Sequence, residues 1–174
     1  MIEQLKSDFN KMTENLKFSE NNIEFRKKNL TNFIDKGFPN KRIEDWKFSD
    51  LNQIISSNIK NLSFYNDKTY EPKDQLSLIN KFEHNKIIFI NGVISKVDIK
   101  YEDDTKVLIN NGLDLSNNTN GINPLISLNH ALASAHIGIT VKENYSLNKP
   151  LVLYNITTED VNSTALNLRT DIKL

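Results

Sequence analysis

Residues 37–51 read GFPNKRIEDWKFSDL and contain the only tryptophan of the chain, Trp46. The stretch opens with a helix-ending signal, because Gly37 tolerates positive φ and Pro39 prevents the helix from resuming. Trp46 offers a large apolar face and one N–H group, so it can anchor an irregular loop onto a core. We therefore predict that a helix ends at residue 37 and that Trp46 fastens the segment that follows.

Charged residues surround this tryptophan on both sides. Arg42 and Lys47 are placed to pair with Glu44, Asp45 or Asp50. The role expected for the segment is structural rather than catalytic. Its candidate residues are Gly37, Pro39, Arg42, Glu44, Asp45, Trp46 and Lys47.

The segment resembles the motif GxPxRRxEDWKYTxL near the start of the SufD family, which belongs with SufB to the Suf machinery for iron–sulfur cluster assembly. Asn40-Lys41-Arg42 replaces the usual Thr-Arg-Arg, and Phe48-Ser49 replaces Tyr-Thr. Both replacements are mild.

Two later stretches support the resemblance, which extends from about Leu30 to the end of the sequence. Residues 87–95, IIFINGVIS, resemble the family's VFVNGxF hairpin, and residues 123–157 resemble its LNxAFxxDGxxIxVPxGxxLxxPIxLLH segment. Ala135-His136 replaces the usual Asp-Gly before a strand, so the geometry of that turn should differ from the family pattern.

Composition excludes several classes of site. The 174 residues balance 22 basic against 22 acidic side chains, so no net charge attracts the chain to nucleic acid or to an anionic membrane. Cysteine is absent, which rules out disulfides and thiolate ligation of a metal or cluster by this segment. No apolar run is long enough to span a bilayer, and residues 1–6 lack the apolar core of a signal peptide. A cytoplasmic protein is expected.

Helical periodicity dominates the first half. Ile2, Leu5, Phe9, Met12 and Leu16 recur at steps of three and four. A second helix should begin after the capping residue Ser19 and end at Gly37, and the two would form a hairpin that needs a further packing partner. Short helices are expected over 51–55 and around 76–82. Residues 1–83 are thus predicted to be a helical region carrying the Trp46 loop.

Strand patterns dominate residues 84–174. Residues 87–90 and 93–97 flank Asn91-Gly92, a strong hairpin signal. Asn123-Pro124 should start a helix that ends near Ser134. Further strands are expected over 107–109, 137–141, 151–156 and 165–174. The resemblance implies that the last of these begin a right-handed parallel β-helix, so the predicted fold is α+β and the chain is expected to be the N-terminal part of a longer protein.

Motifs for catalysis are missing. There is no phosphate-binding G-x-x-x-x-G-K-[ST] loop, no G-x-S-x-G elbow and no H-E-x-x-H pair. The adjacent carboxylates Glu44-Asp45 and Asp103-Asp104 should point apart. His84 is expected to be exposed, His130 to lie beside the apolar face of its helix, and His136 to open a strand. We expect no catalytic, cofactor-binding or metal-ligating residue in this segment.

The resemblance implies a scaffold or interaction subunit, not an enzyme in itself. Members of the SufD family pair with SufB through their β-helices, and each binds one copy of the ATPase SufC. ATP acts on SufC, and a transient iron–sulfur cluster forms at the level of the complex. The partner-binding residues of the family are expected downstream of Leu174. Three alternatives stay open: a SufB-like scaffold, which a downstream cysteine would favour, a β-helix carbohydrate-active enzyme, and a stand-alone helical adaptor.

Overall fold

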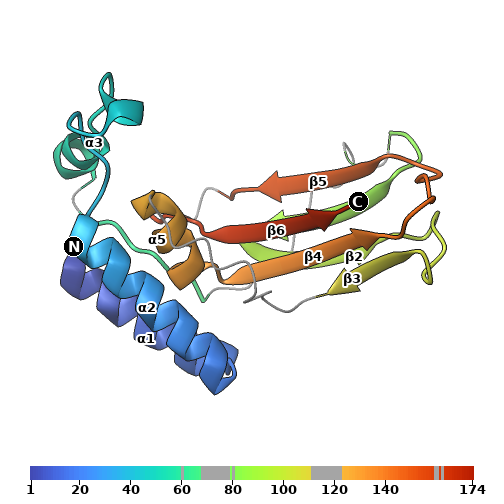
Figure 1. Cartoon of the computed structure of the whole chain (residues 1–174), viewed down its shortest axis with the longest axis horizontal. Coiled ribbons are helices and arrows are strands. Elements are labelled where there is room, and N and C mark those ends of the chain that lie inside the picture. Colours follow the sequence, from blue (N-terminus) through green and yellow to red (C-terminus); the bar gives the residue numbers. More distant parts are fainter. Residues whose placement is uncertain (60, 68–78, 80, 111–122, 159–160, 162) are drawn as a thin grey trace. The chain divides into compact units, whose positions relative to one another are not determined.

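The computed structural model describes residues 1–59, 61–67, 79, 81–110, 123–158, 161 and 163–174, and the fold is mixed α+β (Figure 1). The described part contains four α-helices, one short 3-10 helix and two three-stranded sheets. None of its helices is long and apolar enough to cross a bilayer. The helix expected around 76–82 lies largely outside the described residues.

The chain forms two compact units and crosses between them repeatedly. Unit 1 comprises residues 1–67, 114–134 and 163–167, and unit 2 comprises residues 68–113, 135–162 and 168–174. The sequence suggested a single division near residue 84. The helix at 124–132 instead joins the N-terminal helices, because its apolar face completes their core.

Two amphipathic helices begin unit 1. Helix α1 spans Ile2–Leu16 and buries Leu5, Phe9 and Met12, and helix α2 spans Glu20–Lys36. Ser19 occupies the N-cap position of α2, although its side chain makes no capping bond. At the other end Gly37 has a φ of 69° and its N–H bonds the Phe33 carbonyl at 2.7 Å, which ends the helix as predicted.

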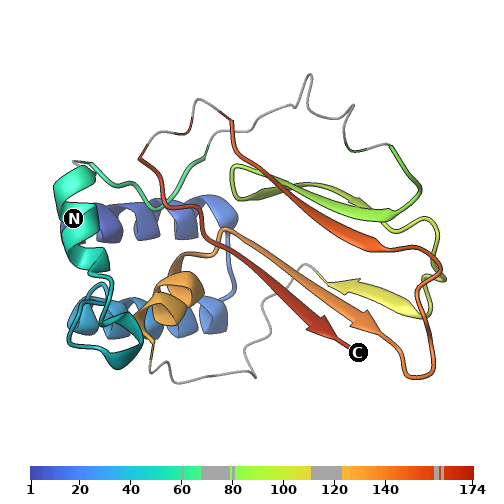
Figure 2. The same cartoon turned by 90° about the horizontal axis from the view of Figure 1, so that it is seen from above.

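Helices α3 and α5 complete unit 1. Asp50 caps α3 (Leu51–Asn58) by accepting the Gln53 N–H at 2.9 Å, and Asn123 caps α5 (Pro124–Leu132) by accepting the Leu125 N–H at 2.9 Å. Figure 2 shows α5 alongside α2. The core of the unit gathers apolar side chains from all four helices: Leu5, Phe9, Met12, Leu30, Phe33, Phe38, Ile55, Phe64, Leu128, Ala131 and Leu132.

The first sheet of unit 2 has the strand order β2-β1-β5. Strands β1 (Asn85–Ile90) and β2 (Val93–Asp98) form an antiparallel hairpin. Asn91 and Gly92 turn it with φ values of 50° and 81°, as the Asn-Gly pair predicts. Strand β5 (Leu151–Ile156) lies parallel to β1 on its other side, so β1 is central and buried on both faces.

The second sheet repeats this arrangement with the order β3-β4-β6. Strand β3 (Val107–Asn110) is antiparallel to β4 (Ala135–Val141), and β6 (Leu168–Lys173) is parallel to β4. Alternate residues of β4 and β1 enter one shared apolar cluster: Ile87, Phe89, Val107, Ala135, Ile137 and Ile139. The two sheets of unit 2 therefore enclose a common core.

Successive strands extend the two sheets in turn. After β4 the chain adds β5 beside β1, then returns to add β6 beside β4, each time in parallel. Within the described residues β5 and β6 are edge strands, and most of their side chains are only half-buried. Unit 2 thus has an antiparallel strand at one end of each sheet and a parallel edge at the other.

Candidate functional site

The Trp46 segment is an ordered loop held mainly by its own backbone. Glu44–Trp46 forms a single 3-10 turn in which the Trp46 N–H bonds the Ile43 carbonyl at 2.8 Å. The Leu51 N–H bonds the Pro39 carbonyl at 3.1 Å and closes the loop at its base. Trp46 is half-buried, whereas Phe48 is 89% exposed. The loop therefore presents one aromatic side chain to solvent while the indole is partly covered.

Among the described residues, only one of the ion pairs expected around Trp46 forms. Lys47 Nζ lies 2.9 Å from Glu44 Oε1, but both side chains are at least half exposed, so this pair contributes little stability. Asp50 caps α3 and forms no ion pair with a basic side chain among the described residues. Arg42 and Asp45 are exposed, and within the described residues neither side chain has an ion-pair partner.

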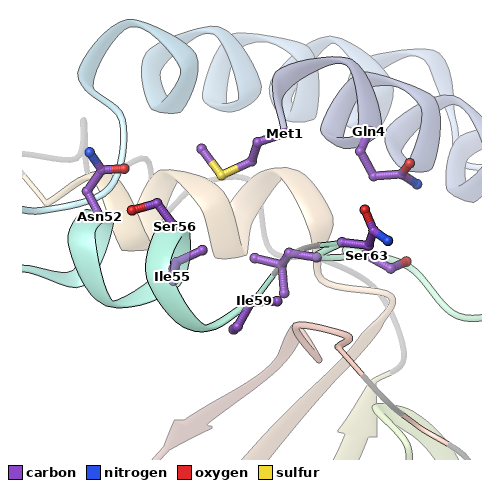
Figure 3. Close-up of a pocket in the computed structure, with 9 residues that line it drawn as sticks. Met1, Gln4, Asn52, Ile55, Ser56, Ile59 and Ser63 are labelled. Carbon is purple, nitrogen blue, oxygen red and sulfur yellow. The ribbon is translucent and has the colours of Figure 1, made fainter.

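A pocket of about 630 Å³ lies in unit 1 between the start of α1 and helix α3 (Figure 3). We call it the α1–α3 pocket. Helix α3 contributes Asn52, Ile55 and Ser56, whose spacing of i, i+3 and i+4 places them on one face, and its C-cap residue Ile59 follows. The described lining residues are Met1, Gln4, Asn52, Ile55, Ser56, Ile59, Asn61, Leu62 and Ser63. No sequence motif marked this pocket, because its walls come from separate helices and a loop.

A buried carboxylate fixes the polar wall of the α1–α3 pocket. Asp8 is 2% exposed and accepts hydrogen bonds from Gln4 Nε2 at 2.8 Å and from Ser63 Oγ at 3.1 Å. It also accepts the Phe64 N–H at 2.7 Å, so α1 is joined to the loop that follows α3. Gln4 and Ser63 are therefore held in place from behind the pocket.

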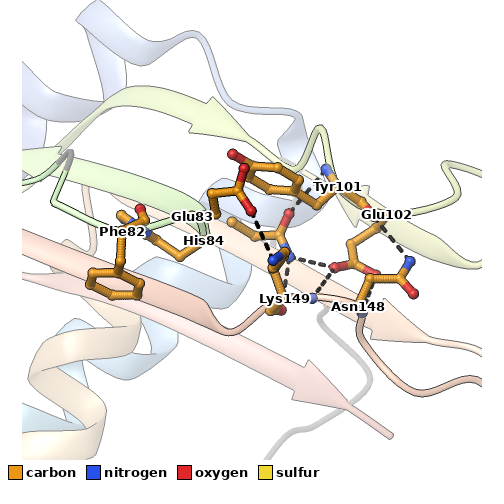
Figure 4. Close-up of polar contacts among 8 residues, drawn as sticks. Phe82, Glu83, His84, Tyr101, Glu102, Asn148 and Lys149 are labelled. Carbon is orange, nitrogen blue, oxygen red and sulfur yellow. Dashed lines mark hydrogen bonds and ion pairs between the residues drawn. The ribbon is translucent and has the colours of Figure 1, made fainter.

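Unit 2 carries a polar network centred on Glu102 (Figure 4). Its carboxylate accepts bonds from Asn85 Nδ2 at 2.6 Å, the Tyr145 hydroxyl at 2.9 Å, and the backbone N–H groups of Asn148 and Lys149 at 2.9 and 3.1 Å. Burial alone would raise the pKa of Glu102, but these hydrogen bonds outweigh it and lower the pKa. The network joins the segment after β2 to the turn before β5, which is a structural task.

The prediction that His84 is exposed is wrong: His84 is 2% exposed. Its Nδ1 lies 2.8 Å from the Phe82 carbonyl, and its Nε2 lies 2.9 Å from the Tyr154 hydroxyl of β5. The ring also lies against Phe82, with centroids 4.3 Å apart. Polar neighbours in sequence concealed this burial, because the covering residue Tyr154 comes from a distant strand.

The neighbouring Glu83 forms an ion pair with Lys149 at 2.8 Å, which lowers the pKa of Glu83 and raises the pKa of Lys149.

The other two histidines are also buried. His130 lies against Phe25 with ring centroids 5.5 Å apart, beside the apolar face as predicted. His136 on β4 places Nε2 2.8 Å from Asp171 Oδ2, while Arg169 Nε lies 3.0 Å from Asp171 Oδ1. Nδ1 of His136 and Nη1 of Arg169 are buried without a partner among the described residues. This cluster joins the parallel strands β4 and β6, and sequence reasoning missed it because the register between them is non-local.

The described residues do not bring a metal-ligand set together. They contain no group of three or more histidine, cysteine or acidic side chains that could hold a metal ion. Glu44 and Asp45 lie exposed on the Trp46 loop, and Asp103 accepts bonds from Thr105. Among the described residues, the surface features that stand out are the exposed Phe48, the α1–α3 pocket and the edge strands of the two sheets.

No protein-family model matches the sequence, and the comparison with curated proteins gives no significant match.

Proposed function

We propose that the chain is a SufD-like scaffold subunit of the Suf iron–sulfur cluster assembly complex, acting with SufB and the ATPase SufC. The observation that carries this proposal is the segment from Gly37 to Leu51, which resembles the family motif with mild replacements at Asn40-Lys41 and Phe48-Ser49. The α+β organisation supports it, since a helical unit accompanies a unit built mainly of strands.

The arrangement of unit 2 supports the idea that a right-handed parallel β-helix begins here. A parallel β-helix grows when the chain alternates between sheets and places each new strand parallel to its neighbour in the same sheet. Strands β5 and β6 are added in this way, whereas the antiparallel β2 and β3 form the opposite edges of the two sheets. On this proposal, later coils stack on β5 and β6 and complete the core.

The proposed role is to bind partners, with the chemistry performed elsewhere in the complex. ATP hydrolysis belongs to SufC, and the nascent cluster is a cargo of the assembled complex rather than a resident cofactor of this chain. The absence of cysteine from these 174 residues fits such a division of tasks. The proposed location is the cytoplasm.

A pull-down tests the proposal. The product of the complete reading frame, carrying an affinity tag, is co-expressed with SufB and SufC from the same genome. We expect both partners to be retained through washes that keep control Suf complexes intact. Loss of both under these conditions contradicts the scaffold role, and retention of a carbohydrate polymer instead would support the β-helix enzyme alternative.

A further inference from the structure

The turn between β1 and β2 is an asparagine followed by a glycine, a pair that can rearrange chemically. The backbone nitrogen of Gly92 can attack Cγ of Asn91, because glycine has no Cβ to shield that nitrogen. A new N–C bond then closes a succinimide ring, the bond from Cγ to Nδ2 breaks, and Nδ2 leaves as ammonia with the proton of the Gly92 nitrogen. Water reopens the ring to an aspartyl or an isoaspartyl residue. Since water is the only co-reactant, the conformation of Asn91 controls the rate.

Three hydrogen bonds to the chain at the end of β5 hold Asn91 in a conformation that opposes this attack. The Asn91 N–H donates to the Ile156 carbonyl at 2.9 Å. Its Oδ1 accepts the Thr158 N–H at 2.9 Å, and its Nδ2 donates to Thr158 Oγ1 at 2.8 Å. The last two bonds fix the plane of the side-chain amide, and Asn91 is only 2% exposed to water. Cγ therefore cannot turn toward the Gly92 nitrogen while both bonds to Thr158 persist.

The segment that restrains Asn91 lies where local opening costs little. Ile156 is the last residue of β5, an edge strand among the described residues, and most side chains of β5 are only half-buried. Strand ends with few buried contacts open at a lower free energy than the core of a domain. Separation of residues 156–158 from the turn would release the amide of Asn91 and admit water. The reactivity of Asn91 should therefore follow the state of the end of β5.

We propose that Asn91 is a conformationally gated deamidation site, unreactive while Thr158 holds its amide and reactive once the end of β5 separates from the turn. Deamidation removes the nitrogen that donates to Thr158 Oγ1. The isoaspartyl product also adds a carbon atom to the backbone of a turn whose two residues both have positive φ. Opening of β5 thus leaves a covalent mark that weakens its return. The inference concerns unit 2 alone and does not depend on the SufD-like assignment.

Peptide mapping by liquid chromatography and mass spectrometry tests the inference. The whole chain is incubated in mildly alkaline buffer with and without denaturing urea, and samples are digested with trypsin over time. Cleavage after Lys86 and Lys96 releases residues 87–96, in which Asn91 is the only asparagine. The aspartyl and isoaspartyl forms of this peptide are separated from the parent form. We expect deamidation of Asn91 to be at least about tenfold slower in the folded chain than in urea.

Variants at Thr158 and a matched control at Thr157 identify the restraint. Thr158→Val keeps the shape of the side chain but removes the acceptor of Nδ2, so it should raise the rate in the folded chain about three- to tenfold. Thr158→Ser keeps the hydroxyl and should stay slow. Thr157→Val makes the same change at an exposed neighbouring position and should leave the rate unchanged.

Circular dichroism confirms that each variant is folded, and the rates in urea should be the same for all of them. The comparison of folded and unfolded parent chain decides the outcome even if Thr158→Val does not fold. Equal rates for the parent with and without urea would overturn the proposal. So would a folded Thr158→Val chain that deamidates no faster than the parent, or an equal acceleration by Thr157→Val.

Discussion

At the scale of the residue, Arg26 of α2 is unusual because it is buried although no described carboxylate forms an ion pair with it. It is 1% exposed, and its Nε bonds Asn22 Oδ1 at 2.6 Å while its Nη1 bonds the Ala131 carbonyl at 3.1 Å. The guanidinium also lies 4.0 Å from the centre of the Phe18 ring. Burial lowers the pKa of Arg26 to about 10. The carbonyl groups at the C-terminal end of α5 carry partial negative charge, which offsets part of the cost of burying this guanidinium.

Arg26→Lys should therefore destabilise the protein although it keeps the charge. An ammonium cannot reproduce the planar fork or the stacking on Phe18, and we expect a loss of about 2 kcal/mol in the free energy of unfolding. Urea denaturation measures this loss. Lys27→Ala, at an exposed position of the same helix, is the control and should change stability by less than about 0.5 kcal/mol. Equal losses in the free energy of unfolding for the two variants would show that the buried guanidinium of Arg26 contributes no special stability.

Asp171 gives a pH-dependent prediction. Burial opposes ionisation of this carboxylate, but the hydrogen bonds from His136 and Arg169 outweigh burial and lower its pKa. A pKa lowered by folding stabilises the native state above the unfolded value of about 3.9, and this contribution is lost as the pH falls through the folded value.

Asp171→Asn should accordingly be less stable than the parent at pH 7, and the difference should shrink as the pH is lowered below about 4. Thermal unfolding at a series of pH values provides the measurement. Asp104→Asn, at an exposed position, controls for the loss of one negative charge. A gap between Asp171→Asn and the parent that stays constant down to pH 2 would show that the carboxylate of Asp171 is not the group responsible.

Because Trp46 is partly exposed, we expect its replacement by alanine to cause only a modest loss in the free energy of unfolding. Full burial would predict a loss of about 3 kcal/mol for Trp46→Ala, but the indole is only half-buried, so we expect about 1–2 kcal/mol. Phe48→Ala, at an 89% exposed position, should be neutral within about 0.5 kcal/mol. The two unfolding curves separate a fastening role from a surface role. If Trp46→Ala is also neutral, the segment is better explained as a contact for a partner.

At the scale of the element, the β1–β2 hairpin combines a local turn with a long-range connection. Asn91 takes the positive φ that the turn requires, and its buried side chain also bonds Thr158 beyond β5. Oδ1 of Asn91 accepts the Thr158 N–H at 2.9 Å, and Nδ2 donates to Thr158 Oγ1 at 2.8 Å. The same residue therefore shapes one hairpin and holds the end of a parallel strand beside it.

Asn91→Gly separates these two tasks, since glycine keeps the turn but loses both bonds to Thr158. We expect it to cost about 2 kcal/mol, more than the roughly 1 kcal/mol expected for Gly92→Ala, which strains the turn alone. Asn144 also has positive φ but is exposed, so Asn144→Gly is the matched control and should be nearly neutral. The reverse order of the first two costs, measured by urea denaturation, would mean that the turn rather than the Thr158 connection dominates.

At the scale of the whole molecule, sequence reasoning succeeded where the determinants are local. The helix end at Gly37, the Asn91-Gly92 turn and the start of α5 at Asn123-Pro124 each depend on a few adjacent residues, and all three predictions are confirmed. Pairing between distant strands leaves no such pattern. This is why the burial of His84 under Tyr154 was not predicted.

The interleaving of the two units has the same origin. A periodic apolar face on residues 125–132 predicts a helix but does not say which core that face joins. The α1–α3 pocket could not be predicted for a similar reason, because α1, α3 and residues 61–63 meet only in the folded unit. The sequence thus predicts where most helices and strands lie, but not which of them pack together.

The central claim is that this chain contributes one SufD-like subunit to a Suf assembly complex, and native mass spectrometry tests it most directly. The product of the complete reading frame is purified together with SufB and SufC, and the mass of the intact assembly is measured. The account predicts one copy of this protein, one copy of SufB and two copies of SufC. An assembly of SufB and SufC alone, with this protein left unbound, would contradict it.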